Sequence, residues 1–263
     1  MKLLVTGSSG TLGTAVNRAA VAAGHQFIGW NRQAADPLTP ASHPAYIDAI
    51  APDAILHLAV AATSTGRDNE GWRTTVDWSL GLADYAAQRG LPLVFTSTAL
   101  VFDNSLSGPF TLASATNARE GYGFEKRCAE HGVLLRHPGG ARVARLGWQI
   151  DPQGSGNNMV AHAHREMAAH GAIGASRRWQ PACSFVDDTA TALLRLIDAP
   201  PGLYMLDSNR DGASFADILR ALSQTFGYHW QIAENEDYVY DQRLIDPRHG
   251  MPALAVHLPS LAR

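Results

Sequence analysis

Charged residues, cysteines and long apolar runs are all scarce in this chain of 263 residues. Charged residues make up 17% and the formal net charge is -3, so no basic surplus favours a nucleic-acid partner or an anionic membrane surface. Two cysteines, Cys128 and Cys183, make no disulfide framework and indicate reduced thiols. No apolar run reaches membrane-spanning length, and the opening MKLLVTG lacks the pattern of a signal peptide. We therefore expect a cytoplasmic protein without membrane or nucleic-acid partners.

Hydrophobic residues make up 46% of the chain, which is typical of a compact α/β protein. Apolar runs without alternation predict strands buried on both faces. They occur at 2–7, 26–30, 54–60, 92–98 and 141–148. Helical stretches lie between them at 11–24, 42–50, 69–90 and 120–132. This alternation predicts a doubly wound parallel sheet of the Rossmann type.

Three glycines stand between the first predicted strand and the first predicted helix. In TGSSGTLG, Gly7 permits a tight turn, Gly10 lets the backbone approach a pyrophosphate, and Gly13 allows the helix to pack closely. The phosphates would lie at the amino end of the helix, where N–H groups favour anions. A tight turn without a ligand is the alternative, which the spacing of the glycines disfavours. The other loop residues expected at the cofactor are Ser9, Thr11 and Leu12.

The second strand ends near Trp30, where an NAD-specific protein would offer an acidic residue to the ribose. Here Trp30, Asn31 and Arg32 follow one another without an acid. An arginine can pair with a 2′-phosphate, so NADP(H) is favoured and NAD(H) is left open. The alternative is that Arg32 is a solvated loop residue.

The alternation is lost after residue 150. We expect an NADP-binding domain over 1–150, to which 184–200 returns, and a small carboxyl-terminal substrate-binding region over 151–183 and 201–263. Within that region 151–158 is expected to be a loop, and 158–171 and 215–227 are expected to be helices. The proline-rich tail predicts loops and short turns.

The stretch GYGFEK places Tyr122 four residues before Lys126, so both side chains share one face of the predicted helix. The fourth strand ends TSTALVFD, which brings the Thr98 hydroxyl to the edge of the sheet where ligands bind. A phenol with a pKa of about 10 transfers protons poorly at neutral pH. A nearby ammonium and an oxidised cofactor would lower that pKa. The alternative is a phenol and an amine on a solvated helix.

The motifs TGxxGxxG, the hydroxyls of strand four, YxxxK and the later SFVDD together resemble the extended short-chain dehydrogenase/reductase family. The resemblance implies that Tyr122 is the general acid/base. It implies that Lys126 lowers the pKa of that phenol and holds the nicotinamide ribose. It assigns the orientation of the substrate oxygen to Thr98, with Ser97 as the second claimant.

Within that family the chain is most similar to the dTDP-4-dehydrorhamnose reductase branch, since STALVFD resembles STDYVFD and KRCAE resembles KLAGE. GSGNNMV and LIDPRH resemble later segments of that branch. The likeness implies that Asp36 lies near the adenine and that Leu58 and Ala59 line the cofactor. Ala99 and Leu100 replace the Asp-Tyr of STDYVF in the substrate pocket, which puts a dTDP-sugar substrate in doubt. STALVF also resembles the SSATVYG of nucleotide-sugar epimerases.

The resulting hypothesis is an NADP(H)-dependent oxidoreductase that reduces a ketone, with a 4-keto sugar nucleotide as the candidate substrate. The alternatives are a nucleotide-sugar epimerase or dehydratase and a non-catalytic NADP-binding regulatory subunit. The expected partner is a small carbonyl compound, and a homodimer is left open. Substrate contacts are expected from Thr98, Ala99, Leu100, Tyr122 and Trp179, although Trp179 could equally be a surface loop residue. No metal site is expected, because His162 and His164 lie about 200° apart around a helix.

Overall fold

The computed structural model describes residues 1–61, 65–153, 156–248 and 250–262. Gly154 and Ser155 of the expected loop, and His249 of LIDPRH, lie outside the described residues. The chain forms two compact units. The first comprises 1–103, 116–145 and 190–204, and the second comprises 104–115, 146–189 and 205–263. Within the described residues, no helix is long and apolar enough to cross a membrane.

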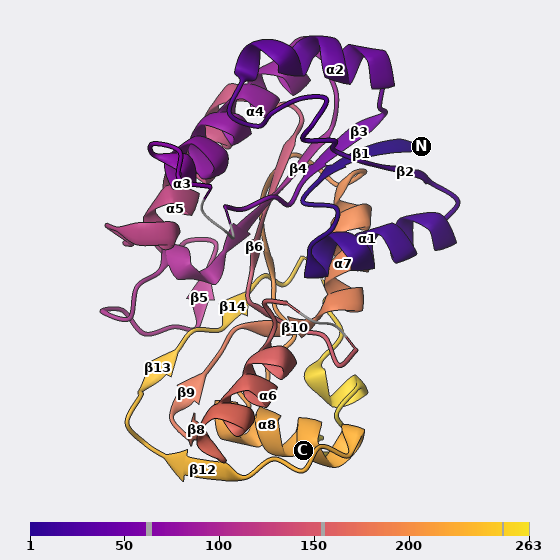
Figure 1. Ribbon diagram of the computed structural model, residues 1–263. Coiled ribbons are helices and arrows are strands. Elements are labelled where there is room, and N and C mark those ends of the chain that lie inside the picture. Colours follow the sequence, from indigo (N-terminus) through magenta and orange to yellow (C-terminus); the bar gives the residue numbers. More distant parts are fainter. Residues whose placement is uncertain (62–64, 154–155, 249, 263) are drawn as a thin grey trace. The chain divides into compact units, whose positions relative to one another are not determined.

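A six-stranded parallel sheet forms the first unit, in the order β2-β1-β3-β4-β6-β11 (Figure 1). The strands are β1 (Lys2–Thr6), β2 (Gln26–Gly29), β3 (Ala54–His57), β4 (Leu93–Thr98), β6 (Ala141–Leu146) and β11 (Gly202–Leu206). β1 pairs in parallel with β2 on one side and with β3 on the other, so the strand order reverses at β1. The predicted doubly wound sheet is confirmed. In such sheets ligands bind at the carboxyl ends of the strands beside this reversal.

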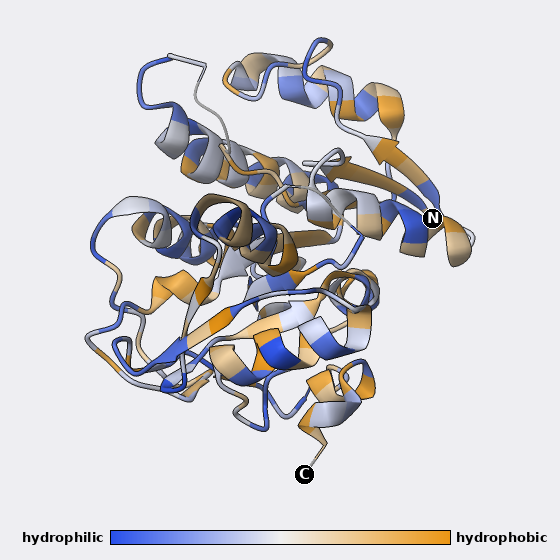
Figure 2. Cartoon of the chain, turned by 60° about the horizontal axis from the view of Figure 1, so that its bottom comes forward, coloured by the Kyte–Doolittle hydropathy of each residue, from blue (hydrophilic) through white to orange (hydrophobic). Residues whose placement is uncertain are grey.

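Helices cover both faces of this sheet (Figure 1). One face carries α1 (Thr11–Ala22) and the end of α7 (Val186–Leu196), and the other carries α2 (His43–Ile50), α4 (Trp78–Arg89) and α5 (Gly121–Arg136). The helix expected over 69–90 is divided into the short α3 (Glu70–Trp72), a π-helical turn (Arg73–Asp77) and α4. The central strands β1, β3 and β4 are mostly apolar and buried, as the absence of alternation predicted, whereas β2 at the edge of the sheet is only partly buried. The helices mix hydrophilic and hydrophobic residues (Figure 2).

The second unit contains α6 (Met159–His170) and α8 (Phe215–Phe226) with four small parallel strand pairs. The pairs are β7 (Trp148–Ile150) with β10 (Cys183–Phe185), β8 (Ile173–Ser176) with β12 (Ile232–Asn235), β9 (Trp179–Gln180) with β13 (Tyr240–Asp241), and β5 (Phe110–Thr111) with β14 (Leu244–Ile245). α8 begins at a capping box, in which Ser214 and Asp217 each bond the other's backbone N–H. It ends at Gly227 in the left-handed conformation (φ 69°).

Candidate active site

The glycine loop leaves no room for side chains on its inner side. Gly7 has a left-handed backbone (φ 68°), and a Cβ there would meet the Ala59 nitrogen at 2.9 Å. A Cβ on Gly13 would lie 2.2 Å from the Gly7 carbonyl oxygen. Gly10 caps α1 with extended backbone and without a side-chain bond to the helix, and the first turn carries no acidic residue. The amino end of α1 therefore presents backbone N–H groups, as a diphosphate site requires. Ser9 is exposed there, and Thr11 and Leu12 are half-buried.

Buried hydrogen bonds tie the carboxyl ends of β1 and β3 together. The Thr6 hydroxyl accepts the N–H groups of Leu58 and Ala59 at 3.1 and 3.2 Å, so its own proton points to His57 Nδ1 at 2.7 Å. His57 Nε2 then donates to the Ser79 hydroxyl at 2.9 Å. Desolvation, and after it the charge of Lys126, hold the pKa of His57 well below its ordinary 6.5. The imidazole is thus neutral, and it holds the Thr6 hydroxyl in the orientation that accepts the N–H groups of Leu58 and Ala59.

The residues after β2 include no carboxylate beside the expected ribose position. Asn31 accepts the Gln33 N–H on its own side chain at 2.9 Å, and Arg32 is exposed. Asp36, further along the same loop, receives Nη1 of Arg67 on both carboxylate oxygens, at 2.9 and 2.7 Å. Desolvation alone would raise the pKa of Asp36, but bonds from the Leu38 N–H and from Arg67 lower it. Arg67 was not foreseen, because it lies in a loop distant in sequence.

Lys126 is buried, and its ammonium bonds the main chain. Nζ donates to the Thr96 carbonyl at 2.8 Å and lies 4.5 Å from the centre of the Phe95 ring and 5.8 Å from that of Tyr122. Desolvation lowers the pKa of this ammonium to about 7, although the carboxylates of Glu125 and Glu130 act in the opposite direction. The side chain is 1% exposed. A buried ionisable group with a strongly shifted pKa is typical of functional sites.

Tyr122 is 40% exposed on the first turn of α5. Desolvation raises the pKa of its phenol, and the charge of Glu125 raises it further. The expectation was a pKa lowered by the ammonium together with an oxidised cofactor. In the structure the Lys126 ammonium bonds Thr96 and lies 5.8 Å from the Tyr122 ring centre, and desolvation governs the pKa of the phenol, which is neutral and carries its proton at neutral pH.

The two hydroxyls at the end of β4 have different surroundings. Ser97 is buried and donates to Glu130 at 2.7 Å, whereas Thr98 is half-buried and its Oγ1 accepts the Leu100 N–H at 3.2 Å. Ala99 is buried and Leu100 is 49% exposed. β4 and α5 lie side by side (Figure 1). α5 also packs directly on the 3₁₀ turn Ala99–Val101 that follows β4, because a Cβ on Gly123 would lie 2.1 Å from the Leu100 carbonyl oxygen.

Trp179 belongs to the second unit, where it is half-buried among other rings. Its ring centre lies 4.8 Å from that of Phe215, 5.4 Å from that of Tyr238 and 6.2 Å from that of Trp148. This environment is that of a packing residue within its unit, and its contact with a substrate stays a prediction. His162 contacts Trp148, and His164 contacts Tyr228 and Trp230. In the described part of the chain, no group of three His, Cys, Asp or Glu could hold a metal ion.

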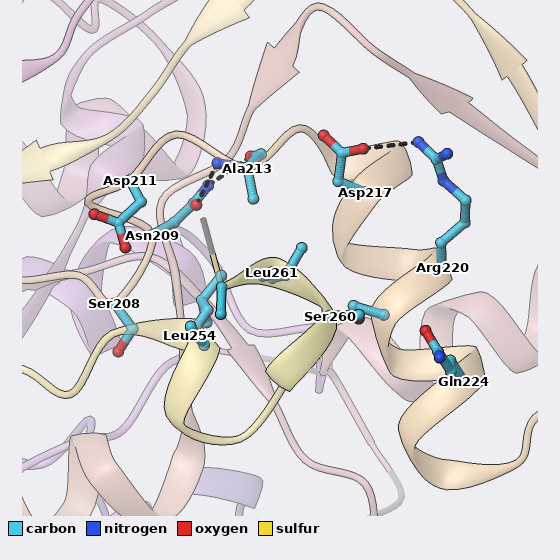
Figure 3. A pocket seen from close by; sticks show the side chains of 13 residues that line it. Ser208, Asn209, Asp211, Ala213, Asp217, Arg220, Gln224, Leu254, Ser260 and Leu261 are labelled. Atoms are coloured by element: carbon cyan, nitrogen blue, oxygen red, sulfur yellow. Dashed lines mark hydrogen bonds and ion pairs between the residues drawn. The ribbon is translucent and has the colours of Figure 1, made fainter.

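The second unit also has a cavity of about 370 Å³ between α8 and the carboxyl-terminal turns (Figure 3). None of the predicted site residues lines it. Two pairs of the groups drawn there bond one another: Asn209 with the backbone of Ala213, and Asp217 with Arg220 at 2.7 Å.

Residues 1–202 match the family whose description is RmlD substrate binding domain. The chain belongs to this family. The dTDP-4-dehydrorhamnose reductase of Mycobacterium tuberculosis is 27% identical over 205 residues, which cover 75% of this RmlD-family chain and 66% of that protein. The match thus spans just under two thirds of the relative's length.

Two solved structures place the RmlD-family chain among related folds. The dTDP-4-dehydrorhamnose reductase of Bacillus anthracis in complex with NADP has a TM-score of 0.81 at 16% identity, with 98% and 97% of the two chains covered. The UDP-glucose 4-epimerase of Thermotoga maritima with UDP-glucose has a TM-score of 0.74 at 19% identity, with 93% and 88% covered. The RmlD-family chain is therefore a distant homologue of sugar-nucleotide reductases and shares its fold with epimerases.

Proposed function

We propose that this protein is an NADP(H)-dependent reductase of a ketone, with a 4-keto sugar nucleotide as the candidate substrate. The observation that carries the proposal is the set Thr98, Tyr122 and Lys126 at the adjoining ends of β4 and α5. A buried ammonium and a neutral phenol in contact with the ligand-binding edge of a doubly wound sheet suit proton transfer to a carbonyl oxygen. The reductase relatives support the same reaction class.

The residues around the glycine loop fit a dinucleotide. Gly7 and Gly13 pack so closely on the protein's own main chain that neither admits a Cβ, whereas a Cβ on Gly10 would meet only the Gly7 carbonyl oxygen, at 3.4 Å, which leaves room for a phosphate beside it. NADPH would supply the hydride when bound there. The backbone of Leu58 and Ala59 would line the cofactor, and Asn31 and Arg32 would lie at its 2′-phosphate. Asp36 would lie near the adenine.

Each of the three catalytic candidates has a distinct role. Tyr122 donates its phenolic proton to the substrate oxygen, and the Thr98 hydroxyl orients that oxygen. Lys126 supplies a positive charge that stabilises the phenolate left behind and would hold the nicotinamide ribose. Ser97 is not proposed for the orienting role, because its hydroxyl is already bonded to Glu130.

Within the first unit the substrate would meet Thr98, Ala99, Leu100 and Tyr122, and the contacts expected from Trp179, 151–183 and 201–263 stay predictions. Leu100 offers an exposed apolar side chain where reductases with STDYVF have a tyrosine. We therefore expect the best substrate to differ from that of such reductases at the part that meets residue 100.

The test measures NADPH oxidation by the purified protein against a panel of keto sugar nucleotides and simpler ketones. Tyr122→Phe should lower turnover by about 10²–10⁴-fold, as expected for the loss of a general acid, and leave NADPH affinity nearly unchanged. Thr98→Ala should lower turnover and spare cofactor binding. Undiminished turnover in Tyr122→Phe would refute the mechanism.

Two other results would favour the alternatives. Interconversion of sugar nucleotides without net NADPH consumption would favour an epimerase, a reading that the shared fold keeps open. Tight NADPH binding without reduction of any carbonyl in the panel would favour a regulatory subunit.

A further inference from the structure

A buried carboxylate lies one helical turn beyond Lys126. Glu130 is 4% exposed, and both of its oxygens are bonded. Arg145 donates Nη2 to Oε1 at 2.5 Å and Nε to Oε2 at 3.1 Å. The Ser97 hydroxyl donates to Oε2 at 2.7 Å. Because a buried charge is costly unless it is paired and hydrogen-bonded, these contacts allow Glu130 to be ionised.

Arg145, the cation that pairs with Glu130, is also buried. Arg145 is 4% exposed on β6, and its guanidinium lies 5.1 Å from the centre of the Phe102 ring. The carboxylate therefore connects three elements: α5, which carries it, β4 through Ser97, and β6 through Arg145. Removal of the carboxylate would leave a guanidinium buried without its counter-charge.

The spacing along α5 relates this connection to the reaction. Tyr122, Lys126 and Glu130 follow one another at intervals of four residues and so share one face of the helix. Lys126 bonds the carbonyl of Thr96, and Glu130 bonds the hydroxyl of Ser97. These bonds attach α5 to the two residues that directly precede Thr98.

We propose that Glu130 is a positioning residue, which acts through Ser97 to hold the end of β4 against α5 and so aligns the Thr98 hydroxyl with the Tyr122 phenol. The inference rests on the proposed function, since it concerns the same proton transfer. Glu130 also places a negative charge near the Lys126 ammonium.

The charged surroundings of Lys126 define what a pH measurement should show. α5 contributes Tyr122, Glu125 and Glu130 to these surroundings, and β3 contributes the neutral His57. β6 adds Arg145, paired to Glu130. The carboxylates of Glu125 and Glu130 both raise the pKa of the ammonium. Loss of either charge should therefore lower the pKa of Lys126, so that the ammonium loses its proton at a lower pH.

The first experiment measures kcat at about pH 6, where wild-type Lys126 is charged, in Ser97→Ala and Glu130→Gln. Ser97→Ala keeps the buried ion pair and removes one charge-assisted hydrogen bond, so kcat should fall about tenfold with little change in NADPH affinity. The kcat of Glu130→Gln should fall by at least the same factor. In the double variant the two losses should not multiply, because both act through one contact.

Glu125→Gln is the matched control, because it removes a carboxylate beside Lys126 and leaves the contact between Ser97 and Glu130 intact. At pH 6 its kcat should fall only about twofold, the part that a lower pKa of Lys126 explains. A folded Ser97→Ala protein with wild-type kcat, or losses that multiply in the double variant, would overturn the positioning role. Ser97→Ala decides the question even if Glu130→Gln does not fold.

The second experiment needs no substrate. NADPH affinity, followed by fluorescence, should weaken as pH rises through the pKa of Lys126. The midpoint in Glu130→Gln should lie lower by on the order of one pH unit. If the wild type binds NADPH but reduces no ketone, the proposed function fails while this midpoint still tests Glu130. An unchanged midpoint would then overturn the inference.

Discussion

Replacement of Lys126 by methionine should make the stability of the protein depend differently on pH. Methionine has a similar length and can occupy the same buried position over Phe95, but it carries no charge. It also loses the bond from Nζ to the Thr96 carbonyl. The change in that bond when the ammonium loses its proton is already part of the shifted pKa of Lys126, so a comparison of two pH values measures the pH-dependent part of the stability.

The magnitude follows from the pKa of the ammonium, which desolvation lowers from its ordinary 10.5 to about 7. Between these values the unfolded chain binds the proton and the folded chain does not, so the free energy of unfolding rises with pH. At 1.36 kcal/mol per pKa unit, integration from pH 7 to pH 9 gives a gain of about 2 kcal/mol for the wild type. Lys126→Met lacks this gain. Its stability relative to the wild type should therefore be about 2 kcal/mol higher at pH 7 than at pH 9.

Urea unfolding followed by circular dichroism at both pH values measures this difference. Lys2→Met is the matched control, since it removes an ammonium that also bonds a backbone carbonyl, that of Ile50 at 2.8 Å, at a half-buried position. A difference between wild type and Lys126→Met that stays constant from pH 7 to pH 9 would refute the reasoning. It would mean that burial does not lower the pKa of Lys126 to about 7.

Three further predictions concern the cofactor loop and the second unit. Arg32→Ala should reduce the preference for NADPH over NADH in fluorescence titrations, and equal affinities of the wild type for both cofactors would contradict that role. Gly13→Ala should weaken NADPH binding at least tenfold, because its methyl would lie 2.2 Å from the Gly7 carbonyl oxygen. Gly81→Ala, where a Cβ meets nothing within 4 Å, should retain wild-type affinity. Asp207 accepts three backbone N–H groups while 2% exposed, so Asp207→Asn, which puts a donor against a donor, should lower the free energy of unfolding by about 1–3 kcal/mol in urea.

Much of the first unit could be predicted from the sequence because its signals are local. Strands buried on both faces appear as unbroken apolar runs, and the glycine loop lies directly between a strand and a helix. The helix carrying Tyr122 and Lys126 was expected over 120–132 and spans Gly121–Arg136. β11 was missed, although GLYML is mostly apolar, because the run is short and it joins the sheet only through pairing with residues distant in sequence.

The remaining features depend on contacts between residues far apart in sequence. β9 and β13 each have two residues and exist because they pair across about sixty residues of chain. The ion pair of Glu130 with Arg145 was missed for a similar reason, although one sign was available: Glu130 continues the spacing from Tyr122 through Lys126. The raised pKa of Tyr122 arises from desolvation, which no local pattern expresses.

Gly123 meets the Leu100 carbonyl without any side chain between them, so main-chain atoms set the distance from the start of α5 to the end of β4. The exposed side chain of Leu100 can therefore change in size and polarity while Tyr122 keeps its place, whereas the buried Ala99 has no room for a larger side chain. In the proposed reductase, this arrangement separates the residue that would transfer the proton from the residue that would select the substrate. Evolution, or a protein engineer, could then exchange one ketone for another at residue 100 and leave Tyr122 in place.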